Sequence, residues 1–241
     1  NNWTQRATVG MMPWLFRGYI EDGIFQNVDE IANSPLPVDN NGNPRPIDPQ
    51  NGIWVGDVKY KDLNGDGKID IKDETDIGNP WPKYTMGWTN NVTYKNFELS
   101  LFFTGTFGND IYNMIAAQNS NPNNVNLSRN FFVSAMNYAK LEEKNGQVVL
   151  SNPQTTIPRI SNNQIASDNN YGRITDRFVE DGSFIRLKNI SLSYNVGSNL
   201  LTKLKVIKGI RATIGAQNLF TFTKYKGYDP EEGSYVGTGS G

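Results

Sequence analysis

Histidine and cysteine are both absent from the 241 residues of this chain. Without an imidazole or a thiol, the chain cannot build a Ser-His-Asp or Cys-His catalytic set. It also cannot hold zinc, haem or an iron–sulfur cluster through nitrogen or sulfur ligands. These two absences exclude the commonest hydrolases and most transition-metal enzymes. A chain without cysteine is also compatible with an exported bacterial protein.

An excess of charge of one sign and long apolar runs are missing as well. The 23 basic and 24 acidic residues leave a net charge of -1, which gives no electrostatic attraction for nucleic acid. No stretch approaches the roughly 18 consecutive apolar residues of a transmembrane helix. Aromatic residues make up 12% of the chain, and glycine and asparagine are frequent, while the mean hydropathy is only -0.55. This composition favours β-structure with long loops.

The first residues carry no secretory signal peptide, and the chain does not begin with methionine. We therefore expect it to be an internal piece of a longer protein. Its length suits one large domain or two small ones.

Alternation of apolar and polar residues is the dominant pattern of the chain. It runs through residues 84–94 and 97–104, on either side of a tight turn at Lys95-Asn96. A second pair covers 189–196 and 210–217. Successive side chains of a strand point to opposite faces, so this pattern predicts antiparallel strands with one apolar and one polar face. The two strands of the first pair are about ten residues long each, enough to cross a bilayer at a tilt.

Two fold classes fit these strands. In a soluble sandwich the apolar face would form a core, whereas in an outer-membrane barrel it would face lipid. The barrel is favoured by the small uncharged side chains of the polar face, by aromatic residues at strand ends, and by short turns that alternate with long loops such as 105–176. We therefore predict that the outward-facing side chains are Tyr84, Met86, Trp88, Val92, Leu99, Leu101, Ile190, Leu192, Ile210 and Ile214, and that the lumen-facing ones are Thr85, Thr89, Asn91, Ser191, Ser193, Thr213 and Gln217.

A calcium-loop pattern lies between residues 62 and 73. Oxygen-bearing side chains stand at loop positions 1, 3, 5, 9 and 12, and glycine at position 6 permits the sharp turn. Position 12 is an aspartate where calcium sensors usually have a glutamate, and no helices flank the loop. The alternative is an Asx-rich turn that bonds only to its own backbone. We predict a lone structural Ca²⁺ held by Asp62, Asn64, Asp66, the Lys68 carbonyl, Asp70 and Asp73.

The long loop has one segment with a helical pattern. This segment is residues 131–144 (FFVSAMNYAKLEEK), which Ser128 would cap and Asn145-Gly146 would end. The acidic pairs 142–143 and 231–232 are adjacent only in sequence, so they do not form the carboxylate pair of a glycosidase. We therefore expect that this protein is not an enzyme. Three loop aromatics can stack on a sugar substrate or serve only in packing: Trp54, Trp81 and Tyr112.

Four longer motifs occur in an order and spacing that resemble one family. They are GDVKYKDLNGDGKID at 56–70, YKNFELSLFF at 94–103, VEDGSFIRLKNISLSY at 179–194 and GAQNLFTFTKYKGYDP at 215–230. Through them, nearly the whole chain resembles the C-terminal region of SusC/RagA-type TonB-dependent outer-membrane transporters of Bacteroidetes.

This resemblance implies an all-β fold: an antiparallel transmembrane β-barrel of about 22 strands with long extracellular loops, of which this chain supplies late strands. Residues 1–241 would then lack the plug domain and the terminal strand. The implied function is active import of a large nutrient, an oligosaccharide or a peptide, across the bacterial outer membrane. The implied partners are a SusD-like surface lipoprotein, TonB acting through the plug, and the lipid bilayer with its lipopolysaccharide. The alternative function is a calcium-stabilised surface adhesin or a carbohydrate-binding β-sandwich.

Overall fold

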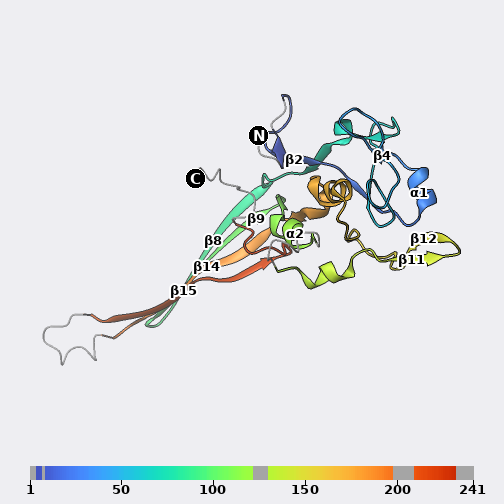
Figure 1. Cartoon of the computed structure of the whole chain (residues 1–241). Helices are drawn as coiled ribbons and strands as arrows, with labels where there is room; N and C mark the ends of the chain where they lie inside the picture. Colours follow the sequence, from blue (N-terminus) through green and yellow to red (C-terminus); the bar gives the residue numbers. More distant parts are fainter. Residues whose placement is uncertain (1–3, 7–8, 122–129, 198–208, 232–241) are drawn as a thin grey trace, which may run out of the picture. The chain divides into compact units, whose positions relative to one another are not determined.

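The chain forms mainly β-strands that belong to two compact units (Figure 1). The computed structural model describes residues 4–6, 9–121, 130–197 and 209–231. Unit 1 consists of Asn1–Pro80 and Tyr112–Val179, and unit 2 consists of Trp81–Ile111 and Glu180–Gly241. No helix in the described ranges is long and apolar enough to cross a membrane.

Unit 2 contains a four-stranded antiparallel sheet in the order β15-β14-β9-β8 (Figure 1). The alternation predicts all four strands, and β8 has the expected bounds. The other three are longer than the pattern indicates, and the predicted connection between the last two lies mostly outside the described residues. The bounds are Tyr84–Tyr94 for β8, Phe97–Phe107 for β9, Phe184–Asn195 for β14 and Arg211–Thr223 for β15.

The two predicted hairpins join through the pairing of β9 with β14. Leu99 lies opposite Leu192, and Leu101 lies opposite Ile190. A register shift between Leu187 and Asn189 places one extra residue in β14 relative to β9. Because a shift of one residue would turn the apolar set to the other face, this bulge keeps apolar side chains together along the full strand.

The sheet is open at both edges in the described part of the chain, where β8 and β15 each have one neighbouring strand. The predicted antiparallel β-structure is confirmed. A closed barrel of about 22 strands stays a prediction, because it would need strands from elsewhere.

Unit 1 is built from two segments that are far apart in the sequence. Its largest hydrophobic cluster combines Phe25, Ile31 and Ile53 of the first segment with Ala139 and Leu150 of the second. A further cluster joins Phe16 to Tyr112 and Phe178. The long loop between β9 and β14 is therefore a packed part of unit 1 over most of its length, held by apolar surface removed from water.

The elements of unit 1 are short. They are joined by loops with many side chain–backbone hydrogen bonds, as the high asparagine and aspartate content favours. In chain order they are β1 (Gln5–Arg6), β2 (Leu15–Gly18), β3 (Glu21–Ile24), α1 (Val28–Ala32), β4 (Leu36–Pro37), β5 (Val58–Tyr60), β6 (Lys68–Ile69), η1 (Ile71–Asp73), β7 (Thr75–Gly78), α2 (Met114–Asn119), η3 (Val133–Asn137), β11 (Leu141–Lys144), β12 (Gln147–Leu150), α3 (Gln164–Ser167), η4 (Asp168–Gly172) and η5 (Asp176–Phe178), with β10 (Asp110–Tyr112) and β13 (Val179–Asp181) where the chain passes between units.

The helix expected over residues 131–144 is wrong. The segment begins with the 3₁₀ turn η3 and continues as β11, which pairs with β12 in an antiparallel hairpin. Asn145 and Gly146 form the two-residue turn, both with positive φ (55° and 77°). Asn-Gly is the preferred sequence for such a turn, so it outweighs the weak helical pattern. The expected cap, Ser128, lies outside the described residues.

Candidate functional site

The sheet of unit 2 has two chemically different faces. The cross-strand register places the predicted outward set on one face and the predicted lumen set on the other, apart from Ile210, which precedes β15. Aromatic pairs cross between strands on the apolar face. The rings of Trp88 and Phe103 stack at 5.4 Å, and those of Tyr84 and Phe107 stack at 4.8 Å. Such cross-strand pairs stabilise the sheet and fix its register.

Large side chains of the apolar face are exposed rather than covered. Trp88 is 53% exposed, Ile214 is 73% exposed and Phe222 is 67% exposed. A continuous apolar face of this size on a water-soluble protein would be an interaction surface or an aggregation hazard. It is the surface that a lipid-facing strand presents.

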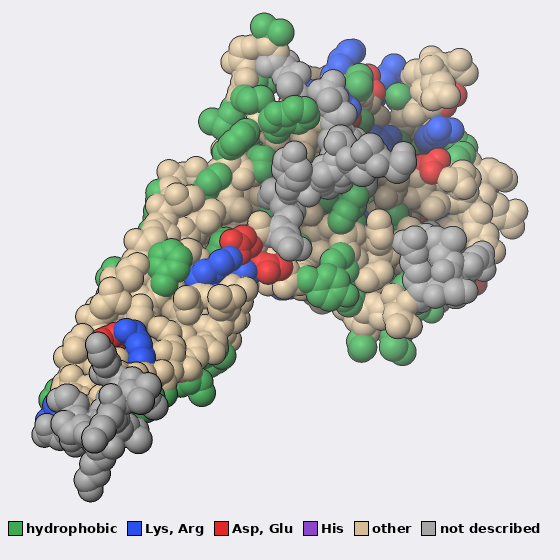
Figure 2. All heavy atoms as spheres, turned by 90° about the vertical axis from the view of Figure 1, so that its left-hand side faces the viewer, with side chains coloured by type: hydrophobic (Ala, Val, Ile, Leu, Met, Phe, Trp, Pro, Cys, Tyr) green, Lys and Arg blue, Asp and Glu red, His purple; other side chains and the backbone are tan. Residues whose placement is uncertain are grey.

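The opposite face is polar and internally hydrogen-bonded. The hydroxyl groups of Ser193 and Thr213 lie 2.9 Å apart, and Glu98 accepts from Arg211 at 2.6 Å and from Asn195 at 2.9 Å. The expectation of uncharged side chains on this face is wrong in part, because Glu98 and Arg211 both belong to it. Figure 2 shows small groups of charged side chains among polar ones along the sheet. They are tolerated because they pair with one another in contact with water.

Arg186 is the second centre of charge on the polar face. Its guanidinium donates to Thr221 at 2.9 Å and forms ion pairs with Asp229 and Glu231, which follow β15. Arg186 is itself buried. The chain after β15 is therefore tied back to this face of the sheet. Glu231 has an ion-pair role here, whereas Glu232 lies outside the described residues.

The predicted calcium loop, residues 62–73, follows β5 and includes β6 and the 3₁₀ turn η1, which contains Asp73. Asp62 accepts backbone N–H groups of Gly65 at 2.7 Å and Gly67 at 2.8 Å, while the buried carboxylate of Asp73 accepts those of Leu63 and Asp70. These bonds order the loop. Since each carboxylate oxygen has two lone pairs, an accepted N–H leaves capacity for a cation.

The carboxylates do not converge on one point in the described residues, where no group of three acidic side chains is placed to hold a metal. The ammonium of Lys72 stands 3.7 Å from Asp66 and 4.0 Å from Asp70. Asn64 donates to Asp66 at 3.1 Å. Calcium binding would therefore require the side chains to turn inward and the Lys72 ammonium to leave. Calcium at this loop stays a prediction.

The three aromatic candidates do not form one surface. Trp54 packs at the edge of the largest hydrophobic cluster of unit 1. Tyr112 is buried between Phe16 and Phe178, whose ring centroids each lie 6.2 Å from its own. Trp81 belongs to unit 2 and is 47% exposed. Tyr112 thus serves the core, and a stacking role for Trp54 or Trp81 stays a prediction.

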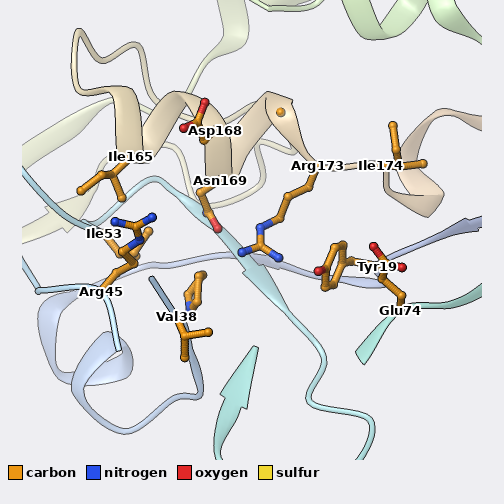
Figure 3. Close-up of a pocket in the computed structure, with 12 residues that line it drawn as sticks. Tyr19, Val38, Arg45, Ile53, Glu74, Ile165, Asp168, Asn169, Arg173 and Ile174 are labelled. Carbon is orange, nitrogen blue, oxygen red and sulfur yellow. The ribbon is translucent and has the colours of Figure 1, made fainter. Parts of the chain in front are cut away.

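A cavity of about 390 Å³ opens within unit 1. Arg45 and Arg173 approach it from opposite sides, and Asn169 lies above it (Figure 3). Burial raises the pKa of the Tyr19 hydroxyl in its wall, although Arg173 opposes the shift. Tyr19 is therefore neutral and does not cancel the charge of Arg173. Sequence reasoning did not find this site, because Arg45 and Arg173 are more than a hundred positions apart and follow no motif.

Comparisons with known proteins agree with the two-faced sheet. No protein-family model matches the chain. The TonB-dependent receptor P3 of Formosa agariphila is 35% identical over 182 residues, which cover 73% of this chain and 15% of the relative. The TonB-dependent receptor P26 of the same organism is 29% identical over 236 residues, or 98% of this chain and 21% of the relative. The TonB-dependent receptor SusC of Bacteroides thetaiotaomicron is 30% identical over 174 residues, or 71% of this chain and 15% of the relative.

A solved structure, the RagAB peptide transporter, matches with a TM-score of 0.63 at 21% identity, covering 97% of this chain and 22% of that one. At this identity the likeness shows the fold alone. The chain thus spans about a fifth or less of the length of these relatives. The two-faced sheet, the fold and the named relatives agree, and the chain belongs to the SusC-type TonB-dependent receptors.

Proposed function

We propose that this chain forms part of the wall and the extracellular loops of an outer-membrane transporter that imports a large nutrient, an oligosaccharide or a peptide. The observation that carries the proposal is the sheet of β8, β9, β14 and β15, with one exposed apolar face and one polar face. Four strands alone would leave unpaired backbone groups at both edges, which hydrocarbon does not tolerate. The remaining strands of a barrel would satisfy them.

Transport, rather than chemistry, suits the residues on the polar face. They are hydroxyl, amide and paired charged side chains, which line a water-filled path without binding one ion tightly. An adhesin or a carbohydrate-binding sandwich would instead bury the apolar face under a second layer. The 73% exposure of Ile214 speaks against that alternative.

We also propose the two protein partners that membership of this family implies. A SusD-like surface lipoprotein would cap the extracellular side, and TonB would supply energy through a plug. Unit 1, which contains the long loops, would lie on the extracellular side. The two-residue turn at Lys95-Asn96 would face the periplasm, because barrel strands of this kind have short periplasmic turns and long outer loops.

The orientation of the chain in the outer membrane can be measured, and it tests the proposed function directly. Protease sites are inserted in the full-length transporter at Asn145-Gly146, the hairpin tip of unit 1, and at Lys95-Asn96. On intact cells the first should be cleaved from outside, and the second only after the outer membrane is opened. Extraction of the protein should need detergent. The reverse cleavage pattern, or release of the protein without detergent, would overturn both the topology and the transporter function.

A further inference from the structure

The walls of the cavity come from both segments of unit 1. Arg45 follows β4, and its backbone N–H donates to the Pro37 carbonyl at 2.8 Å, which fixes the start of its side chain. Asn169 comes from η4, and Arg173 immediately follows η4. Figure 3 shows both guanidinium groups directed toward the same space.

Two basic and two acidic side chains line the cavity, and they differ in their partners. Neither Arg45 nor Arg173 forms an ion pair with a carboxylate in the described part of the chain. The acidic side chains in the wall are otherwise engaged. Glu74 pairs with Arg6 at 2.6 Å, and Asp168 accepts from Gln164 at 2.6 Å and points away from the cavity (Figure 3). Two arginines without acidic partners favour an anionic ligand.

Arg173 is held in place by aromatic rings. Its guanidinium carbon lies 4.5 Å from the ring centroid of Tyr19 and 5.4 Å from that of Tyr60. Stacking orders the planar guanidinium, which also hydrogen-bonds to the Tyr19 side chain, and leaves the other N–H groups along its edge for a ligand. An ordered guanidinium loses little conformational freedom when it pairs with a carboxylate, which is a planar group of matching geometry.

The other side chains that line the cavity indicate which groups the ligand carries beside its anionic group. Asn169 is buried, and its Oδ1 accepts no hydrogen bond from any described residue, although its Nδ2 donates to Val58 and Asn170. An N–H or O–H of a ligand would satisfy this acceptor. Aliphatic side chains complete the lining: Val38, Ile53, Ile165 and Ile174.

We propose that this cavity binds the carboxy-terminal residue of a peptide. The carboxylate lies between Arg45 and Arg173, the backbone N–H of the same residue donates to Asn169, and a short aliphatic side chain packs on Val38 and Ile165. An acidic sugar fits less well, because sugars favour an open aromatic face and the ring of Tyr19 is covered by Arg173. The site does not depend on transport through the barrel, so its test is separate from the orientation test above.

The test measures binding to the full-length protein in detergent by calorimetric titration. The probe is N-acetyl-L-valine, which has the carboxylate, the N–H and the aliphatic side chain. N-acetyl-L-valinamide, which lacks the charge, is the matched control ligand and should bind at least tenfold more weakly. Arg45→Gln and Arg173→Gln should each raise the Kd for N-acetyl-L-valine at least tenfold. Lys144→Gln, at the exposed end of β11, should leave it unchanged.

A fourth variant separates loss of the cavity from loss of charge. Val38→Trp fills the cavity while it keeps both arginines, so it should abolish binding without loss of charge. Each variant's melting temperature is measured alongside. Equal binding of the acid and the amide, or unchanged binding by a folded Arg45→Gln protein, would overturn the proposal. Arg173-dependent binding of glucuronate that is tighter than that of N-acetyl-L-valine would also overturn it, and would assign the cavity to acidic sugars.

Discussion

The guanidinium of Arg159 donates two hydrogen bonds to the carboxylate of Asp57, from Nε to Oδ1 at 2.8 Å and from Nη2 to Oδ2 at 3.1 Å. Both side chains are buried. The carboxylate also accepts from the Trp54 backbone N–H at 2.8 Å and from Asn170 at 2.9 Å. This single carboxylate therefore ties together the two distant segments that make up unit 1.

Loss of one partner of this ion pair should destabilise unit 1 strongly. Asp57→Ala leaves the Arg159 charge buried without a partner, and we expect a loss of about 3–5 kcal/mol in the free energy of unfolding. The matched control is Asp22→Ala, which removes an aspartate that is 46% exposed and pairs with Lys59 at 3.1 Å. An exposed pair contributes roughly 0.2–1 kcal/mol. Denaturant unfolding in detergent measures both variants, and similar losses would contradict the special role of Asp57.

Calcium binding to residues 62–73 should be revealed by thermal stability. Ca²⁺ at a hundredfold excess over its Kd would stabilise the folded chain by roughly 2.7 kcal/mol, and Mg²⁺ should act much less because it demands a smaller, more regular site. Lys72→Met should increase calcium affinity, since the ammonium stands among the ligands. Asp62→Asn should decrease it.

The matched control for the calcium test is Asp39→Asn. Asp39 also accepts two backbone N–H groups in a polar turn, those of Asn41 and Asn43, but its loop lacks the ligand spacing. Its substitution should not alter the response to calcium. A melting temperature that is insensitive to calcium in the unmodified protein would show that residues 62–73 are only an Asx-rich turn.

A new charge should destabilise the sheet far more on its apolar face than on its polar face. Trp88→Arg places a guanidinium on the apolar face, where it should cost about 2–4 kcal/mol near the bilayer midplane. Thr89→Arg places the same group on the polar face, one residue along β8, where the cost should be much smaller. The folded fraction in lipid bilayers at graded denaturant concentrations measures both. Equal costs would mean that the apolar face does not contact lipid.

Glu21 should make the stability of unit 1 depend on pH. It lies beside Arg177, with Oε1 3.3 Å from Nε. Burial raises the pKa of Glu21 above its ordinary value, and Arg177 only partly opposes this shift. The folded chain therefore holds this proton more tightly than the unfolded chain. The stability that Glu21 contributes is fully present below its ordinary pKa and is lost as the pH rises through the raised value.

Glu21→Gln removes this titration. The melting temperature of the variant relative to the unmodified protein should therefore rise between mildly acidic and neutral pH. Asp22→Asn changes the next acidic residue along the chain, whose side chain is 46% exposed, and is the control. A difference between Glu21→Gln and the unmodified protein that stays constant across this pH range would show that the pKa of Glu21 is not raised.

The sequence alone was sufficient for the sheet of unit 2. Alternation is a local property, since each residue's face follows from its neighbours two positions away. The strands, their two faces and the tight turn at Lys95-Asn96 were therefore predicted correctly. The extension of β14 toward Phe184 was not, because the bulge near Lys188 shifts the alternation of that strand by one residue.

The fold of unit 1 was determined by tertiary contacts. Residues 131–144 show a helical pattern, yet the Asn145-Gly146 turn and the packing of Leu150 with Phe25 and Ile53 make the segment after η3 a hairpin. The pairing of Asp57 with Arg159, and the placement of Arg45 and Arg173 in the wall of one cavity, bring together residues more than a hundred positions apart. No local pattern encodes such contacts. They arise because apolar side chains from both segments must share one core to leave water, and the buried polar groups then need partners there.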